Sequence, residues 1–167
     1  GEAQLMNLFA ATHEALGDRA KALEQYEAAA ALRREIGDKK AEIAARKKIA
    51  VFYEEGKEYP KAVEAYGRAM EIAKASGEKK TEAQLQYAIG KAHKQQKDYP
   101  QAITAYLAAA ELAKAAEDKA LQCDSLWDAG YMYELSKKIS KTIVYLKQAL
   151  QLARESNDAY RQARLLG

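Results

Sequence analysis

Three lysines and three large aromatic residues of this 167-residue sequence together offer the chemistry of partner binding. The residues concerned are Lys47, Lys48, Tyr87, Lys91, Trp127 and Tyr131. Rigid aromatic side chains anchor a bound segment, and cations steer an acidic partner toward it. These residues therefore suit an extended or helical peptide that carries acidic residues. Two other interpretations stay open: the lysines form a solvated face, and the aromatic side chains pack between structural repeats or beneath a further repeat.

Each of these residues belongs to a row whose members are mostly three or four residues apart. This spacing places the members of a row along one side of an α-helix. The four rows are Gln4, Asn7, Leu8 and Ala11; Ala44, Lys47, Lys48 and Val51; Gln84, Tyr87, Ala88 and Lys91; and Asp124, Trp127, Asp128 and Tyr131. The candidate binding residues drawn from them are Asn7, Lys47, Lys48, Val51, Gln84, Tyr87, Lys91, Asp124, Trp127, Asp128 and Tyr131.

The rows recur because the whole chain follows a period of 40 residues. Tyr26, Tyr66 and Tyr106 are separated by 40 residues each, and Leu146 takes the next position. Small residues keep the same register: Ala22, Ala62, Ala102 and Thr142 precede these positions, and Ala29, Ala69, Ala109 and Ala149 follow them. A period of this size indicates a stacked array of helical units, none of which can bury its apolar face alone.

Each period is predicted to contain two helices. Pro60 and Pro100 suit the first turn of a helix, where the missing N–H costs nothing, and Asp18 suits an N-cap. Gly37 and Gly77 suit the left-handed residue that ends a helix. The expected helices span 2–16, 19–36, 39–55, 59–76, 79–96, 99–116, 119–136 and 139–156, and a ninth begins at 158. The expected repeats span about 1–37, 38–77, 78–117 and 118–157, followed by the start of a fifth repeat or a capping helix at 158–167.

The small and aromatic positions also follow a known family pattern. In the third period the matching residues are Gly90, Ala102, Tyr106 and Ala109. With their spacings of twelve, four and three residues, the sequence resembles the tetratricopeptide repeat over essentially its whole length. The other periods match with Ala22, Tyr26 and Ala29; with Ala62, Tyr66 and Ala69; and with Gly130, Tyr133 and Ala149. The long period is similar to the variant found in Pins-type G-protein-signalling modulators, rapsyn and kinesin light chains.

This resemblance implies an all-α fold, an alpha–alpha superhelix (solenoid) of four helical hairpins plus a truncated ninth helix. The first helix of each hairpin would line the concave side, so the four rows would face a groove. The implied function is a protein-interaction scaffold or adaptor that binds a peptide or protein segment in that groove. The alternative is a structural subunit of a cytoskeletal, ciliary or transport assembly, which would use the convex face or self-associate through the solenoid ends. Because helical pattern continues to both ends of the sequence, we expect a single array that is a fragment of a longer protein.

Composition narrows the classes of partner. Hydrophobic residues make up 49% of the chain and charged residues 31%, with a net charge of +3. This composition is typical of a helical protein with a substantial core. Among the four periods only residues 41–80 carry a basic surplus, so a nucleic-acid partner, which needs a basic stripe across several repeats, is not expected. No apolar run is long enough for membrane insertion.

Candidates for catalysis and for metal binding are few. His13 and His93 stand two periods apart, and no glycine-rich phosphate loop is present. We therefore expect neither an enzyme nor a bound metal or cofactor. Cys123 is the only cysteine, so it can form no internal disulfide, and it fits a reducing, cytoplasmic (intracellular) location.

Overall fold

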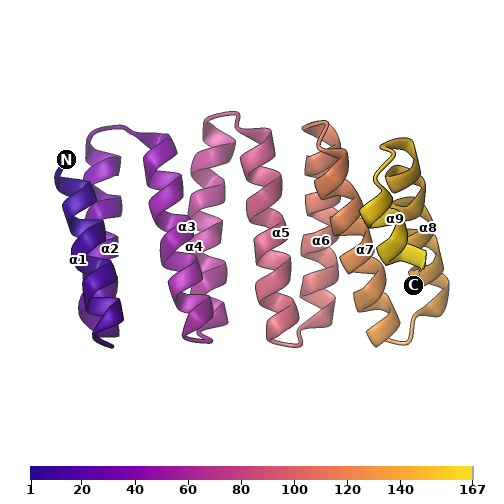
Figure 1. The fold of residues 1–167 in the computed structure, drawn as a ribbon, viewed down its shortest axis with the longest axis horizontal. Coiled ribbons are helices and arrows are strands. Elements are labelled where there is room, and N and C mark those ends of the chain that lie inside the picture. Colours follow the sequence, from indigo (N-terminus) through magenta and orange to yellow (C-terminus); the bar gives the residue numbers. More distant parts are fainter. Residues whose placement is uncertain (167) are drawn as a thin grey trace. The chain divides into compact units, whose positions relative to one another are not determined.

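The computed structural model of the chain describes residues 1–166, with side chains described as far as residue 164. All elements in that range are α-helices (Figure 1). They are α1 (Glu2–Ala15), α2 (Arg19–Glu35), α3 (Lys39–Glu55), α4 (Tyr59–Ala75), α5 (Lys79–Gln95), α6 (Tyr99–Ala115), α7 (Lys119–Leu135), α8 (Ile139–Glu155) and α9 (Ala159–Leu166). The prediction of four helical hairpins and a ninth helix is confirmed within the described residues, and each of the predicted ends lies within one residue of the observed one.

Aspartates begin five of these helices. The Asp18 carboxylate accepts the backbone N–H of Lys21 at 3.2 Å, which confirms the predicted N-cap. Asp38, Asp98, Asp118 and Asp158 accept the N–H three residues on in the same way. A side chain in this position satisfies a backbone donor that has no partner inside the helix. Pro60 and Pro100 lie in the first turn of α4 and α6, as predicted.

A residue with positive φ ends every helix from α1 to α8. These residues are Gly17, Gly37, Lys57, Gly77, Lys97, Glu117, Lys137 and Asn157. After α3, the N–H of Glu58 donates to the Tyr53 carbonyl oxygen at 2.8 Å, and the N–H of Lys57 donates to that of Glu54 at 2.9 Å. This pair of bonds is the Schellman motif, which satisfies the last carbonyls of a helix. The left-handed conformations predicted at Gly37 and Gly77 are confirmed.

The chain divides into two compact units, unit 1 (Gly1–Gly77, α1 to α4) and unit 2 (Glu78–Gly167, α5 to α9). In unit 1, α2 packs against α1 and α3, and α3 packs against α4. In unit 2, successive helices pack against each other, and α5 also contacts α7. The division falls between the second and third predicted repeats, and the single continuous array stays a prediction.

Small residues at the repeated positions let the helices approach closely. Ala22, Ala29, Ala62 and Ala69 are fully buried in unit 1. In unit 2, a Cβ atom on Gly90 would lie 2.7 Å from ring atoms of the buried Tyr106. Buried alanines therefore stand at the repeated positions of unit 1, and in unit 2 the Tyr106 ring fills the space that a side chain at Gly90 would need.

Candidate functional site

The predicted row on α3 is open. Lys47, Lys48 and Val51 are exposed, with Val51 42% exposed. Neither lysine forms an ion pair with any side chain described in residues 1–164. The Lys48 ammonium lies 4.7 Å from the centre of the Tyr26 ring, and Asn7 on α1 is half-buried. The α3 row therefore presents two uncompensated cations beside an apolar side chain.

A small hollow of about 80 Å³ adjoins this row. Its lining residues are Glu14, Tyr26, Lys48, Val51, Phe52 and Glu55. It brings the predicted Lys48 and Val51 together with the core residue Phe52 and with two carboxylates, so apolar groups and charges of both signs face the same space.

A hydrogen bond joins Tyr87 of α5 to Asp128 of α7. Asp128 is buried and accepts the Tyr87 hydroxyl at 2.6 Å and the Lys94 ammonium at 3.2 Å. Burial, the hydrogen bond to Asp128 and the charge of that carboxylate raise the pKa of Tyr87. Two of the predicted binding residues thus form a structural link between α5 and α7, whereas Gln84 and Lys91 on α5 are exposed.

The rest of the α7 row is in contact with α9. Asp124 accepts Arg161 Nε at 3.0 Å and Arg161 Nη2 at 2.7 Å. Arg164 Nη2 donates to the same carboxylate at 2.7 Å, and its guanidinium lies 4.4 Å from the centre of the Trp127 ring. Trp127 in turn stacks on Tyr131, with ring centres 5.7 Å apart. Asp124 and Trp127 of the α7 row are therefore already in contact with arginines of the same chain.

Three of these cations, Lys94, Arg161 and Arg164, were not among the residues predicted from the sequence. One signal was present: Arg164 lies one 40-residue period after Asp124 and so continues its column of the rows. Nothing in the row spacing pointed to Lys94, because it comes from the end of a neighbouring helix.

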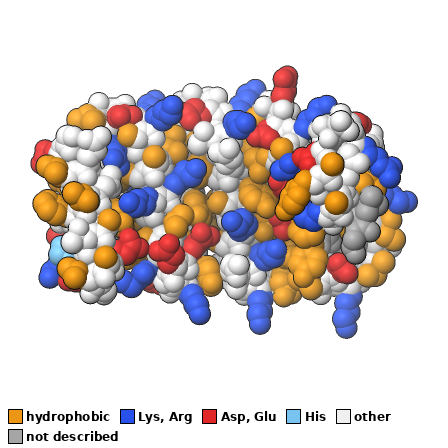
Figure 2. Space-filling view, in the orientation of Figure 1, with side chains coloured by type: hydrophobic (Ala, Val, Ile, Leu, Met, Phe, Trp, Pro, Cys, Tyr) orange, Lys and Arg blue, Asp and Glu red, His pale blue; other side chains and the backbone are white. Residues whose placement is uncertain are grey.

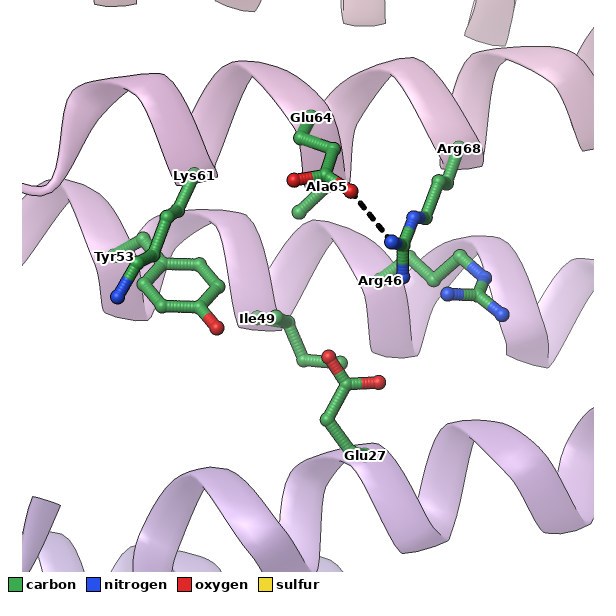
Figure 3. A pocket seen from close by; sticks show the side chains of 8 residues that line it. All are labelled: Glu27, Arg46, Ile49, Tyr53, Lys61, Glu64, Ala65 and Arg68. Carbon is green, nitrogen blue, oxygen red and sulfur yellow. Dashed lines mark hydrogen bonds and ion pairs between the residues drawn. The ribbon is translucent and has the colours of Figure 1, made fainter. Parts of the chain in front are cut away.

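A larger pocket in unit 1, the α2–α4 pocket, was also missed by the sequence analysis (Figure 3). It has a volume of about 250 Å³ and is lined by Glu27 of α2, by Arg46, Ile49 and Tyr53 of α3, and by Lys61, Glu64, Ala65 and Arg68 of α4. The helical period places its α3 residues on the side of that helix away from Lys47 and Lys48. Burial, then the negative charge of Glu27, raises the pKa of Tyr53.

Family models of the tetratricopeptide repeat match residues 1–75 and residues 83–115, which together exceed half of the chain. The chain belongs to the tetratricopeptide repeat family. Both the predicted family and the predicted superhelical fold class are therefore confirmed for this tetratricopeptide repeat protein. A search of curated protein sequences found no significant match.

Solved structures with the same fold include the apo form of RapI, with a TM-score of 0.80, 17% sequence identity, and coverage of 98% of this chain and 46% of RapI. A Rap protein complexed with Competence and Sporulation Factor has a TM-score of 0.74 and 15% identity, with coverage of 98% and 46%. A kinesin light chain-like repeat protein from Podosopora anserina has a TM-score of 0.71 and 12% identity, with coverage of 99% and 83%. The tetratricopeptide repeat protein thus spans less than half the length of the Rap structures. None of its described helices combines the length and apolar character that crossing a bilayer requires.

Proposed function

We propose that this protein is an interaction scaffold that binds an acidic peptide or protein segment along the exposed rows of its first helices. The observation that carries the proposal is the α3 row, where Lys47 and Lys48 are exposed and unpaired within the described residues. Uncompensated cations attract acidic groups, and the adjoining hollow offers apolar contact to a side chain next to the acid. The Rap protein solved with Competence and Sporulation Factor supports the proposal, because a protein of this fold there holds a partner.

Lys91 of unit 2 offers the same chemistry. It is exposed on α5, next to the half-buried Tyr87 of the same row, and pairs with no carboxylate in the described part of unit 2. By contrast, Asp124 and Trp127 on α7 already contact Arg161 and Arg164. The proposed acid-binding residues are therefore Lys47, Lys48 and Lys91, and the α7 residues have a supporting role.

A library of fluorescent peptides that combine acidic and apolar residues tests this proposal. We expect Lys47→Glu with Lys48→Glu to weaken binding by at least about tenfold, because attraction becomes repulsion. Lys39→Glu with Lys40→Glu is the matched control, since these residues are also exposed on α3 and the change in charge is equal. Both variants are first checked for equal helicity by circular dichroism. Binding that survives the first pair of substitutions would contradict the assignment.

A second candidate function, a structural subunit of a larger assembly, is favoured by the exposed apolar face of α1. Leu5, Leu8 and Phe9 are more than half exposed, and Figure 2 shows hydrophobic side chains gathered over α1. Such a face suits a large folded partner or a second copy of the chain. Light scattering across a concentration series separates the two functions: a rise in mass that Leu8→Asp abolishes favours assembly, and a constant monomer mass contradicts self-association.

We also infer a reducing, intracellular location for the scaffold, because the sequence has a single cysteine and so forms no internal disulfide. The Cys123 thiol is buried and donates to the Ala149 carbonyl oxygen at 3.2 Å. Burial raises the pKa of this thiol, which keeps it protonated and unreactive. A cysteine of this kind behaves as a small core residue, so the proposed activity is binding and does not involve thiol chemistry.

A further inference from the structure

The residues around the α2–α4 pocket pack differently from the residues at the same repeat positions in unit 2. Two periods on, Glu27, Arg46 and Ala65 correspond to Leu107, Leu126 and Tyr145. In unit 2 these three residues pack into apolar clusters, and Tyr145 also stacks on Tyr133 with ring centres 5.3 Å apart. Unit 1 has two charged residues and an alanine in their place, so about 250 Å³ stays open. Charged groups that replace core residues cost stability, and positions of this kind are where function is expected.

The positive charges around the pocket are already compensated. Each of the three lining cations forms an ion pair with a glutamate on its own helix or at its start. The pairs are Arg46–Glu42 at 2.9 Å, Lys61–Glu58 at 2.6 Å and Arg68–Glu64 at 2.5 Å. The Arg46 pair is almost wholly buried, with 13% and 7% of the two side chains exposed, so an incoming anion cannot readily replace Glu42.

Glu27 is the lining charge without a partner. No ion pair or hydrogen bond of its carboxylate is formed with the side chains described in residues 1–164. Figure 3 shows this carboxylate reaching from α2 toward the Ile49 side chain, with the Tyr53 hydroxyl on the other side of Ile49. The pocket therefore carries one carboxylate without an ion-pair partner and a nearby hydroxyl that can accept a hydrogen bond.

The floor of the pocket is apolar. Ile49 is 1% exposed and Ala65 is 8% exposed, and the Tyr53 ring forms a side wall. A ligand that fits both the apolar floor and the Glu27 carboxylate has an aliphatic stem and a cationic head, which is the chemistry of long basic side chains. A carboxylate ligand would instead meet Glu27 directly and find each lining cation paired.

We propose that the α2–α4 pocket binds an arginine or lysine side chain of a partner protein, with its stem against Ile49 and Ala65 and its cation at Glu27. The site is independent of the lysine row, which lies on the other side of α3. One scaffold would thus contact an acidic segment on one side of α3 and a basic side chain on the other.

The test uses the full chain and three probes: N-acetyl-arginine amide, N-acetyl-lysine amide and N-acetyl-glutamate amide. Methyl NMR spectra follow Ile49 and Ala65 during each titration. We expect saturable shifts with the arginine and lysine probes and none with the glutamate probe. Glu27→Gln, which keeps the shape of the side chain, should weaken binding by about tenfold, as expected for the loss of one charge-assisted hydrogen bond.

Glu24→Gln is the matched control, because Glu24 is exposed on α2 and does not line the pocket. Ala65→Leu fills the pocket while Glu27 stays in place, and it should abolish the shifts of Ile49 with helicity unchanged. The proposal is overturned if the glutamate probe binds as well as the arginine probe, if Glu27→Gln and Glu24→Gln behave alike, or if no probe shifts Ile49 or Ala65 up to its solubility limit. Comparison of the arginine and lysine titrations shows which side chain is preferred.

Discussion

The rows on α3 and α7 occupy the same repeat positions, yet one is open and the other is engaged. Lys48 on α3 is exposed and free of ion pairs in the described residues, whereas its counterpart Asp128 on α7 is buried between Tyr87 and Lys94. The same sequence spacing therefore produces a surface in unit 1 and a structural network in unit 2. Whether a row can bind a partner depends on the side chains that neighbouring helices extend over it.

Of the substitutions compared between the units, these two counterparts should show the largest difference in stability. Asp128→Ala removes the acceptor of two donors, so we expect a loss of about 2–3 kcal/mol in the free energy of unfolding. Lys48→Ala should change it by less than about 0.5 kcal/mol, because an exposed residue without a partner is removed. Urea denaturation followed by circular dichroism measures both values. Equal losses would show that the α3 row is as structural as the α7 row.

The backbone arrangement of this protein follows from sequence signals that act locally. The period places the helices, aspartates such as Asp18 begin them, and glycines such as Gly37 end them. Local sequence signals do not determine which side chains surround the candidate residues. Arg161 reaches Asp124 from a helix 37 residues away in sequence, and row spacing gives the direction of a side chain but not what covers it. The α2–α4 pocket was missed for the same reason, because it depends on the sizes of residues from three helices.

The tyrosines of the 40-residue register provide a second comparison between the units. In unit 1 each hydroxyl donates to a glutamate twelve residues earlier, in the pairs Tyr26–Glu14 at 2.9 Å and Tyr66–Glu54 at 3.0 Å. Burial, then the bond to Glu14, raises the pKa of Tyr26 to about 12. In unit 2 Lys94 takes the place of the glutamate, and the buried Tyr106 hydroxyl has no hydrogen-bond partner in the described structure.

Removal of single hydroxyls should therefore affect the two units differently. Tyr66→Phe loses a hydrogen bond to a charged group, and we expect it to lower the free energy of unfolding by about 1.5 kcal/mol. Tyr106→Phe removes a buried donor that has no partner, so it should be neutral or slightly stabilising. Thermal and urea unfolding of both variants measure the difference. A similar loss for Tyr106→Phe would contradict the unpaired state of its hydroxyl.

The residues that end the helices differ between the units as well. Three of the four in unit 1 are glycines (Gly17, Gly37 and Gly77), and unit 2 has none. The left-handed conformation costs other residues about 1–2 kcal/mol, because Cβ crowds the backbone. Unit 2 thus forms the same turns at a higher conformational cost.

Among the substitutions that are expected to change stability, those at the turns should have the smallest effect. Lys97→Gly relieves the left-handed strain, offset in part by the greater freedom of glycine in the unfolded chain, so we expect a gain of about 0.5–1 kcal/mol. Gly37→Ala should cause a loss of similar size, and since a Cβ there would have no neighbour within 4 Å, that loss reports backbone strain alone. Lys97→Ala is the matched control, because it removes the charge and keeps the Cβ. If Lys97→Ala stabilises the protein as much as Lys97→Gly, the gain comes from the lost charge, and the turns of the two units do not differ in strain.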